Sequence, residues 1–320
     1  MADENKINLT NKGRIVCSLI RNLLRLLGLI PRPWSVSAGN CLGRLWYGFD
    51  RRHREIALKN LAIAFGNEKK PRELETLAKS VFRNLSQIIF EMGWSLRLDK
   101  EELQKFFSFR GMEHLRIAHL RKKGILLLTG HMGNWELMSV AAALSDYPVN
   151  VLYRPLDHEG MNLFFYRFRT RFGVKMVAHV RSMRKILQIL KKGESIAILM
   201  DQNVDWYEGV FVDLFGERAC TNIGPALIAL GTGSPVLPVF LLRDGLKFVI
   251  EFGEEIPAVR TGDKRKDIEE TTQRYNQVLE TYIRRFPEQW FWIHQRWKTR
   301  PYQPWPRDGA PCRKDNDDGN

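Results

Sequence analysis

The pattern that most limits the fold begins near residue 110, where short apolar runs start to alternate with stretches of helical periodicity. The runs are bounded by glycine or turn residues, and they occupy residues 124–130, 149–155, 174–180, 195–203, 234–245 and 247–256. Helical stretches separate the first five runs, and parallel strands require crossovers of this kind. We therefore predict an α/β fold, with a mostly parallel central sheet that is flanked by helices. The Asp244-Gly245 turn predicts an antiparallel hairpin between the last two runs.

The first 110 residues have helical periodicity, and the segment "RIVCSLIRNLLRLLGLIP" at 14–31 is the most apolar part of them. Its polar positions recur every three to four residues, so a helix here has a narrow cationic stripe and a wide apolar face. The residues before Pro31 would span roughly 25 Å, slightly short for a bilayer core. We predict a membrane-associating helix at about 14–30, either spanning or interfacial, with a core helix of a soluble bundle as the alternative.

The chain therefore divides into three predicted parts. Residues 1–110 form a helical, membrane-docking N-terminal region, and residues 111–302 form the α/β core. Residues 303–320 are rich in Pro, Asp and Gly, and we predict a polar, disordered tail.

The formal net charge of +14 predicts an anionic partner, and half of this excess lies in residues 1–60. An acidic membrane surface fits this bias. Zinc-finger spacing, RNP-like aromatic boxes and basic regions followed by heptads are all missing from the sequence, so we predict no nucleic-acid partner. The four cysteines are scattered without a CxxC pair, which predicts free thiols rather than disulfides or a zinc site.

The stretch "LLLTGHMGNWELM" at 126–138 places His131 at the end of a predicted strand. The carboxyl ends of strands are where open α/β sheets bind ligands. Gly130 and Gly133 let the chain turn sharply, Asn134 is a suitable N-cap, and Glu136 falls in the first turn of the next helix. The helix dipole favours an acid there whatever its function, so a purely structural Glu136 is the alternative.

His131 has three candidate duties: packing, metal binding and chemistry. A metal site lacks a second histidine at ligand spacing, so we predict none. G-x-S-x-G, Walker A and G-x-G-x-x-G motifs are missing too, which leaves a catalytic histidine without an obvious protein nucleophile. The simplest catalytic role is a general base toward a substrate hydroxyl, with Glu136 orienting the imidazole.

"GHMGNWE" resembles the His-x4-Glu motif of the bacterial lipid A late acyltransferases, the lauroyl and myristoyl transferases. Further stretches are similar to this family in the expected order: "DRRHREIALKNLAIAFG", "YRP" at 153–155, the block that begins "LMDQN", and "FPEQWFWIHQRWKTRP". The similarity covers roughly residues 15–302. Broader glycerolipid acyltransferases would carry Phe-Pro-Glu-Gly about seventy residues after the histidine. Here "FPEQ" comes only at 286, so the lipid A branch is favoured.

The resemblance implies an O-acyltransferase of lipopolysaccharide biosynthesis at the cytoplasmic face of a bacterial inner membrane. It would transfer a fatty acyl group from a thioester to a hydroxyl of a lipid A precursor, which is an anionic glycolipid. The expected donor is acyl carrier protein, with acyl-CoA as the alternative, and no cofactor is expected. The rival hypotheses are a related glycolipid or phospholipid acyltransferase, a thioester hydrolase, and an inactive basic protein that binds membranes or nucleic acid.

The resemblance also assigns site residues. His131 and Glu136 are catalytic, with His131 as the base. Arg154 is the candidate for holding the oxyanion or an anionic headgroup, and a surface arginine is its alternative. Asp201, which could instead cap a turn, and Gln202 end the strand at 195–200 on the same sheet edge. The remaining substrate or oxyanion candidates are Gly133, Asn134, Arg171, Arg218 and Thr221.

Overall fold

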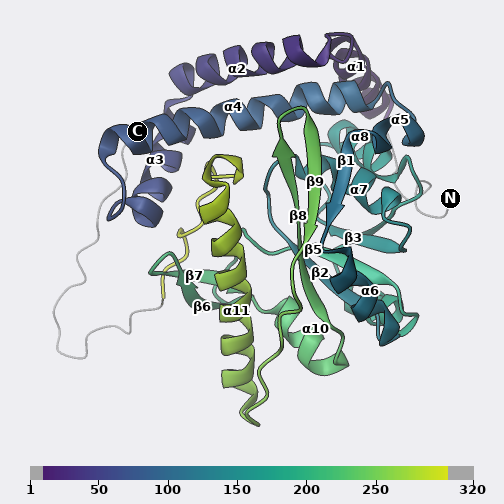
Figure 1. The fold of residues 1–320 in the computed structure, drawn as a ribbon, viewed down its shortest axis with the longest axis vertical. Helices are drawn as coiled ribbons and strands as arrows, with labels where there is room; N and C mark the ends of the chain where they lie inside the picture. The colour runs from purple at the N-terminus through teal and green to yellow at the C-terminus, as the bar shows by residue number, and fades with distance from the viewer. Residues whose placement is uncertain (1–9, 302–320) are drawn as a thin grey trace.

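The computed structural model describes residues 10–301, and a seven-stranded sheet lies at its centre (Figure 1). The strand order is β1-β9-β8-β2-β5-β3-β4, and β8–β9 is its one antiparallel pair. The strands are β1 (Phe107–Arg110), β2 (Ile125–Thr129), β3 (Val149–Tyr153), β4 (Lys175–Ala178), β5 (Ser195–Leu199), β8 (Val236–Asp244) and β9 (Lys247–Phe252). The prediction of a mostly parallel α/β sheet with a β8–β9 hairpin is confirmed.

Helices cover both faces of this sheet. On one face, α7 (Met138–Leu144) and α8 (Glu159–Thr170) pack against one set of alternate strand residues, such as Leu127 and Ala197. On the other face, α9 (Met183–Lys191) and α10 (Gly224–Thr232) pack against the intervening residues, such as Leu126 and Ile196. Side chains alternate across a strand, so one apolar run supplies both cores.

The remaining helices frame this core. They are α1 (Asn11–Leu27), α2 (Arg32–Phe49), α3 (Arg51–Phe65), α4 (Pro71–Ser95), α5 (Lys100–Gln104), α6 (Met112–Leu120) and α11 (Lys264–Arg285), with 3₁₀ turns η2 (Trp135–Leu137) and η3 (Pro287–Gln289). Figure 1 shows α2 and α4 running side by side across the top of the molecule, above the tip of the β8–β9 hairpin.

The predicted membrane-associating helix is α1, which packs on α4 and α8. It crosses α4 closely at Gly28 and Gly93, where a side chain on Gly28 would lie 2.2 Å from the Gly93 carbonyl oxygen. Only Gly13, Cys17 and Leu24 of the helix are buried. Among residues 10–301, no helix is both long enough and apolar enough to cross a bilayer.

Two strand features carry no local sequence signal. The short β1, within the region expected to be helical, extends the sheet by pairing with β9. A separate antiparallel hairpin, β6 (Gly209–Leu214) and β7 (Glu217–Asn222), leaves the core after β5 and packs against α11. The predicted tail at 303–320 lies outside the described residues.

Candidate active site

His131 and Asp201 form the centre of the site. The imidazole Nδ1 lies 2.8 Å from Asp201 Oδ1, and the His131 backbone N–H donates to Asp201 Oδ2, also at 2.8 Å. The indole Nε1–H of Trp290 donates to that same Oδ2 at 2.8 Å. Because an ionised carboxylate only accepts hydrogen bonds, Nδ1 carries the proton and Nε2 keeps a free lone pair.

The charge on Asp201 is stabilised although the side chain is almost completely buried. Burial, the largest influence, would raise its pKa, but the charge of His131 and the three hydrogen bonds outweigh it and lower the pKa to about 2. Asp201 is therefore ionised at neutral pH, and it can stabilise positive charge on the imidazole.

The topology of the sheet brings these two residues together. β2 and β5 are adjacent and parallel, and Thr129 pairs with Leu199 at their carboxyl ends. The chain leaves β2 for α7 on one face of the sheet and leaves β5 toward α10 on the other. Such a switch point opens a crevice between the strand ends. Gly130 makes room for the carboxylate, since a Cβ there would lie 3.2 Å from Asp201 Cγ.

Glu136 is not the partner of the imidazole that we expected. Its two carboxylate oxygens accept hydrogen bonds from Arg169, with Nε–Oε2 at 2.9 Å and Nη2–Oε1 at 2.7 Å. The pair is mostly buried, with 8% of the Glu136 and 21% of the Arg169 side chain exposed. The orienting role belongs to Asp201 instead, because the first turn of η2 directs Glu136 toward α8. A part for Glu136 in catalysis stays a prediction.

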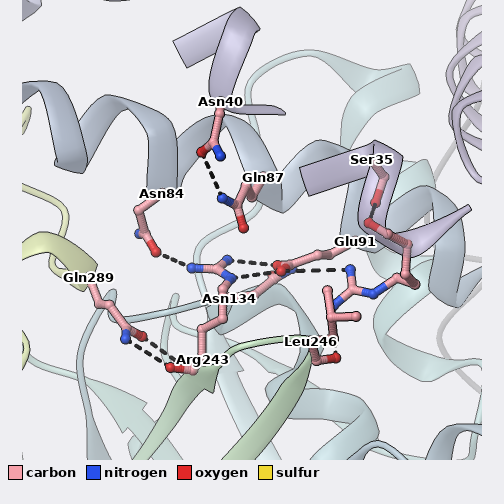
Figure 2. A network of polar contacts seen from close by, with 10 residues as sticks. Ser35, Asn40, Asn84, Gln87, Glu91, Asn134, Arg243, Leu246 and Gln289 are labelled. Carbon is pink, nitrogen blue, oxygen red and sulfur yellow. Dashed lines mark hydrogen bonds and ion pairs between the residues drawn. The ribbon is translucent and has the colours of Figure 1, made fainter. Parts of the chain in front are cut away.

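The loop between His131 and Glu136 is held by a buried polar network (Figure 2). Asn134 does not use its side chain as a helix cap; its Nδ2 donates to Glu91 Oε2 at 2.8 Å. Glu91, on α4, also accepts two hydrogen bonds from Arg243 at the end of β8, both at 2.7 Å. Arg32 on α2 lies 3.8 Å from the same carboxylate. Helices of the N-terminal region thus fix the position of this loop.

Gly133 is a structural requirement of the same loop. Its φ is +58°, and a Cβ there would lie 2.1 Å from the Leu241 carbonyl oxygen. Its N–H donates to the carbonyl of Gln289, whose side chain is hydrogen-bonded to the Arg243 backbone at both N–H and C=O. The predicted sharp turn at Gly133 is confirmed, and it is clamped by the C-terminal segment.

A cavity of about 950 Å³ lies against this centre. His131, Glu136 and Arg169 contribute to its wall, and apolar side chains from both sheet faces form much of the rest: Leu127, Met138, Ala141, Val151, Ile186, Ala197, Val239 and Phe252. Trp135 and Phe291 pack against the imidazole, with ring centroids at 5.2 and 5.8 Å. The imidazole thus lines a largely apolar cavity.

The structure divides the other predicted site residues into two groups. Arg154 and Gln202 line the cavity. Arg154 is mostly exposed and pairs with Asp157 at 3.8 Å, which places it at the mouth of the cavity rather than beside His131.

Arg171, Arg218 and Thr221 do not line this cavity. Arg171 stacks on Phe168, and burial lowers its pKa to about 10. Arg218 is exposed and lies 3.7 Å from Glu269. Thr221 is fully buried and accepts hydrogen bonds from Arg296 and Asn276, so it neither faces the cavity nor caps α10.

Sequence reasoning missed Arg169, Trp290 and Glu91. Each lies far along the chain from its partner, and nothing local marks it. The aromatic segment "QWFWIHQRWK" forms part of the core, since Trp290 and Trp292 are buried and pack edge to face. Among residues 10–301, no three His, Cys, Asp or Glu side chains are grouped as metal ligands.

Comparisons with known proteins identify the family. A sequence model described as bacterial lipid A biosynthesis acyltransferase matches residues 4–299. The chain is 27% identical to the lipid A biosynthesis lauroyltransferase of Escherichia coli (strain K12), with 91% of this chain and 92% of the relative covered. It is 27% identical to the palmitoleoyltransferase of the same strain, covering 85% and 87%. For the myristoyltransferase of that strain, the identity is 22% and the coverage is 81% and 79%.

Proposed function

Because this chain belongs to the bacterial lipid A biosynthesis acyltransferase family, we propose that it transfers a fatty acyl group from an acyl thioester to a hydroxyl of a lipid A precursor. The observation that carries the proposal is the His131–Asp201 pair: Nδ1 is bound to the carboxylate, which leaves Nε2 available, and the imidazole lines the apolar cavity. Acyl transfer to a hydroxyl needs a general base beside a cavity that can hold an acyl chain.

In the first step, Nε2 of His131 takes the proton of the acceptor hydroxyl while the hydroxyl oxygen attacks the thioester carbonyl carbon. Asp201 keeps Nδ1 protonated and stabilises the imidazolium that forms. Such base catalysis typically contributes about 10²–10⁴-fold to the rate.

In the second step, the tetrahedral intermediate collapses and its carbon–sulfur bond breaks. The imidazolium returns its proton to the departing sulfur, so a free thiol and an ester are the products. The intermediate carries negative charge on oxygen, and Arg169 is the cation of the cavity wall that contacts this loop, through its hydrogen bonds to Glu136. In this proposal Glu136 holds Arg169 in place for that charge.

The polar and apolar parts of the cavity suit the two ends of an acyl thioester. The apolar wall between α7 and the sheet would receive the acyl chain, whereas Arg154 at the mouth would contact an anionic part of the donor or of the acceptor headgroup. We propose acyl carrier protein as the donor, with acyl-CoA as the alternative.

The face of α1 supports a membrane site for the reaction. Ile15, Leu19, Leu23 and Leu26 follow helical spacing and are 59–62% exposed. Arg14, Arg21 and Arg25 are exposed on the same helix. An apolar stripe with flanking arginines suits an interfacial helix on an anionic bilayer. We propose that the protein works at the cytoplasmic face of the inner membrane, where its acceptor lipid would be accessible.

The test is to incubate the purified protein with lauroyl-acyl carrier protein and a lipid A precursor that bears a free hydroxyl, and to follow both products by mass spectrometry. Acylated precursor is the expected product. Free fatty acid without acylated precursor would refute acyl transfer and indicate a hydrolase. Neither product, from a protein that still binds anionic vesicles, would indicate a binding protein.

A further inference from the structure

The stretch from residue 160 to 193 contains nine Lys or Arg residues and no Asp or Glu. It comprises most of α8, strand β4 and α9. These nine positive charges are a large part of the net charge of +14 of the whole chain, although Arg169 and Lys175 pair with acids outside the stretch. A segment of this composition attracts an acidic partner.

Part of this charge lies on an exposed surface with a mixed character. We define the α9 surface as Val180, Arg181, Met183, Arg184 and Leu187, which belong to α9 and the turn before it. Val180, Met183 and Leu187 are 64%, 45% and 41% exposed. The two arginines are exposed as well, and neither forms an ion pair with another residue in the range 10–301.

The α9 surface is continuous with the mouth of the active-site cavity. Met183 belongs both to this surface and to the cavity wall, and His179, Ser182 and Ile186 also contribute to the wall. Arg154 lies at the same opening. A partner seated on the α9 surface would therefore have direct access to the cavity that ends at His131.

This surface is separate from the proposed membrane-facing stripe. Helix α1 packs on α4 and α8, and α8 covers one face of the sheet, whereas α9 covers the opposite face. A bilayer and a soluble partner could thus be engaged at once. Apolar side chains flanked by unpaired arginines fit a protein helix with complementary acids better than they fit a nucleotide, which offers no apolar helix face.

We infer that the α9 surface is the docking site for the acidic carrier protein that delivers the acyl chain. This inference rests on the proposed function, because that function requires a thioester donor. Arg181 and Arg184 would contact acidic side chains of the carrier, and Met183 and Leu187 would pack against its apolar residues. The prosthetic arm would then pass beside Arg154 into the cavity.

The experiment compares two donors that carry the same chain, lauroyl-acyl carrier protein and lauroyl-CoA, with Arg181→Glu/Arg184→Glu as the variant. Exposed interfacial charges act mainly on association and its salt dependence. We expect kcat/KM with the carrier protein to fall by about ten- to a hundredfold and to lose much of its salt dependence, while kcat/KM with lauroyl-CoA stays within about threefold. Lys264→Glu/Arg265→Glu, an equal charge change at the start of α11, is the matched control and should leave both donors unaffected.

Direct binding of fluorescently labelled acyl carrier protein separates this inference from the proposed function. Loss of binding in the variant but not in the control supports the docking site, even if no transfer to lipid A is found. Equal losses with both donors would overturn it and indicate a nucleotide contact instead. Unchanged carrier binding would also overturn it, and a loss confined to anionic phospholipid vesicles would assign the surface to the membrane. Leu187→Gln, which keeps both charges, should weaken carrier binding selectively by about threefold or more.

Discussion

Replacing Asp201 by Asn alters the centre of the site without changing its shape. Two N–H groups, those of the His131 backbone and the Trp290 indole, point at Oδ2. An amide at position 201 must therefore place its oxygen there, since an NH₂ group would meet two donors. Its NH₂ then faces Nδ1 of the imidazole, which forces the proton onto Nε2. The substitution removes the base by selecting the wrong tautomer.

The size of the effect follows from the 2.8 Å distance between Nδ1 and Oδ1. With an effective dielectric constant of about 20, two opposite charges at this distance attract by roughly 6 kcal/mol. At about 1.4 kcal/mol per tenfold change in rate, complete loss of this attraction would slow the reaction by at most about 10⁴-fold. The imidazole is only partly charged in the transition state, so we expect kcat to fall by about 10²–10⁴-fold.

The assay is steady-state transfer from an acyl thioester, with kcat and KM measured separately. The KM for the thioester should change by less than about threefold, since the lost interaction acts in the transition state. A double variant, Asp201→Asn/His131→Ala, should be no slower than His131→Ala alone, because the two residues act as one unit. Activity of Asp201→Asn within tenfold of the wild type would refute this reasoning.

The same substitution has a consequence for stability. The native pKa of Asp201 is about 2, against an ordinary value of 3.8. The unfolded chain binds the proton more readily, so this carboxylate contributes about 2 kcal/mol at neutral pH, and the contribution is lost as the pH falls from about 5 toward 2. In chemical denaturation, the free energy of unfolding of Asp201→Asn should fall less between about pH 5 and pH 2 than that of the wild type.

The remaining predictions concern three other places in the molecule. Glu136→Ala should abolish transfer and lower the free energy of unfolding by about 3 kcal/mol, because it leaves Arg169 buried without a partner. Glu136→Gln/Arg169→Met should recover most of that stability, and recovery of transfer as well would mean that the pair is purely structural. Burial lowers the pKa of His294 to about 4, from its ordinary value of 6.5. The unfolded chain therefore binds the proton more readily, and protonation favours unfolding as the pH falls below about 6.5. The free energy of unfolding should therefore be about 2 kcal/mol lower at pH 5 than at pH 7.5, and His294→Gln should not show this difference. Leu19→Glu should weaken binding to anionic phospholipid vesicles by roughly 2 kcal/mol, or about thirtyfold, whereas Asn22→Glu on the same helix should change it far less.

Much of the architecture could be predicted because each strand carries its own signal. Runs such as 124–130 and 195–203 are apolar on both sides, as strands covered by helices must be, and glycines end them. The β8–β9 hairpin followed from its Asp-Gly turn. By contrast, β1 is four residues long and alternates in burial, so its membership of the sheet depends on the position of β9 rather than on any local pattern.

The site also has features that the sequence predicts and features that only the structure reveals. The sequence by itself determined that a histidine flanked by glycines would stand at a strand end, because strand, turn and helix signals are local. It also placed Asp201 at the end of another strand. Only the tertiary structure decided that β2 and β5 are neighbours, which makes Asp201 the partner of His131 and leaves Glu136 to Arg169. The physical reason is that hydrogen-bond geometry acts over about 3 Å, and the fold, not the spacing along the chain, sets which side chains come that close.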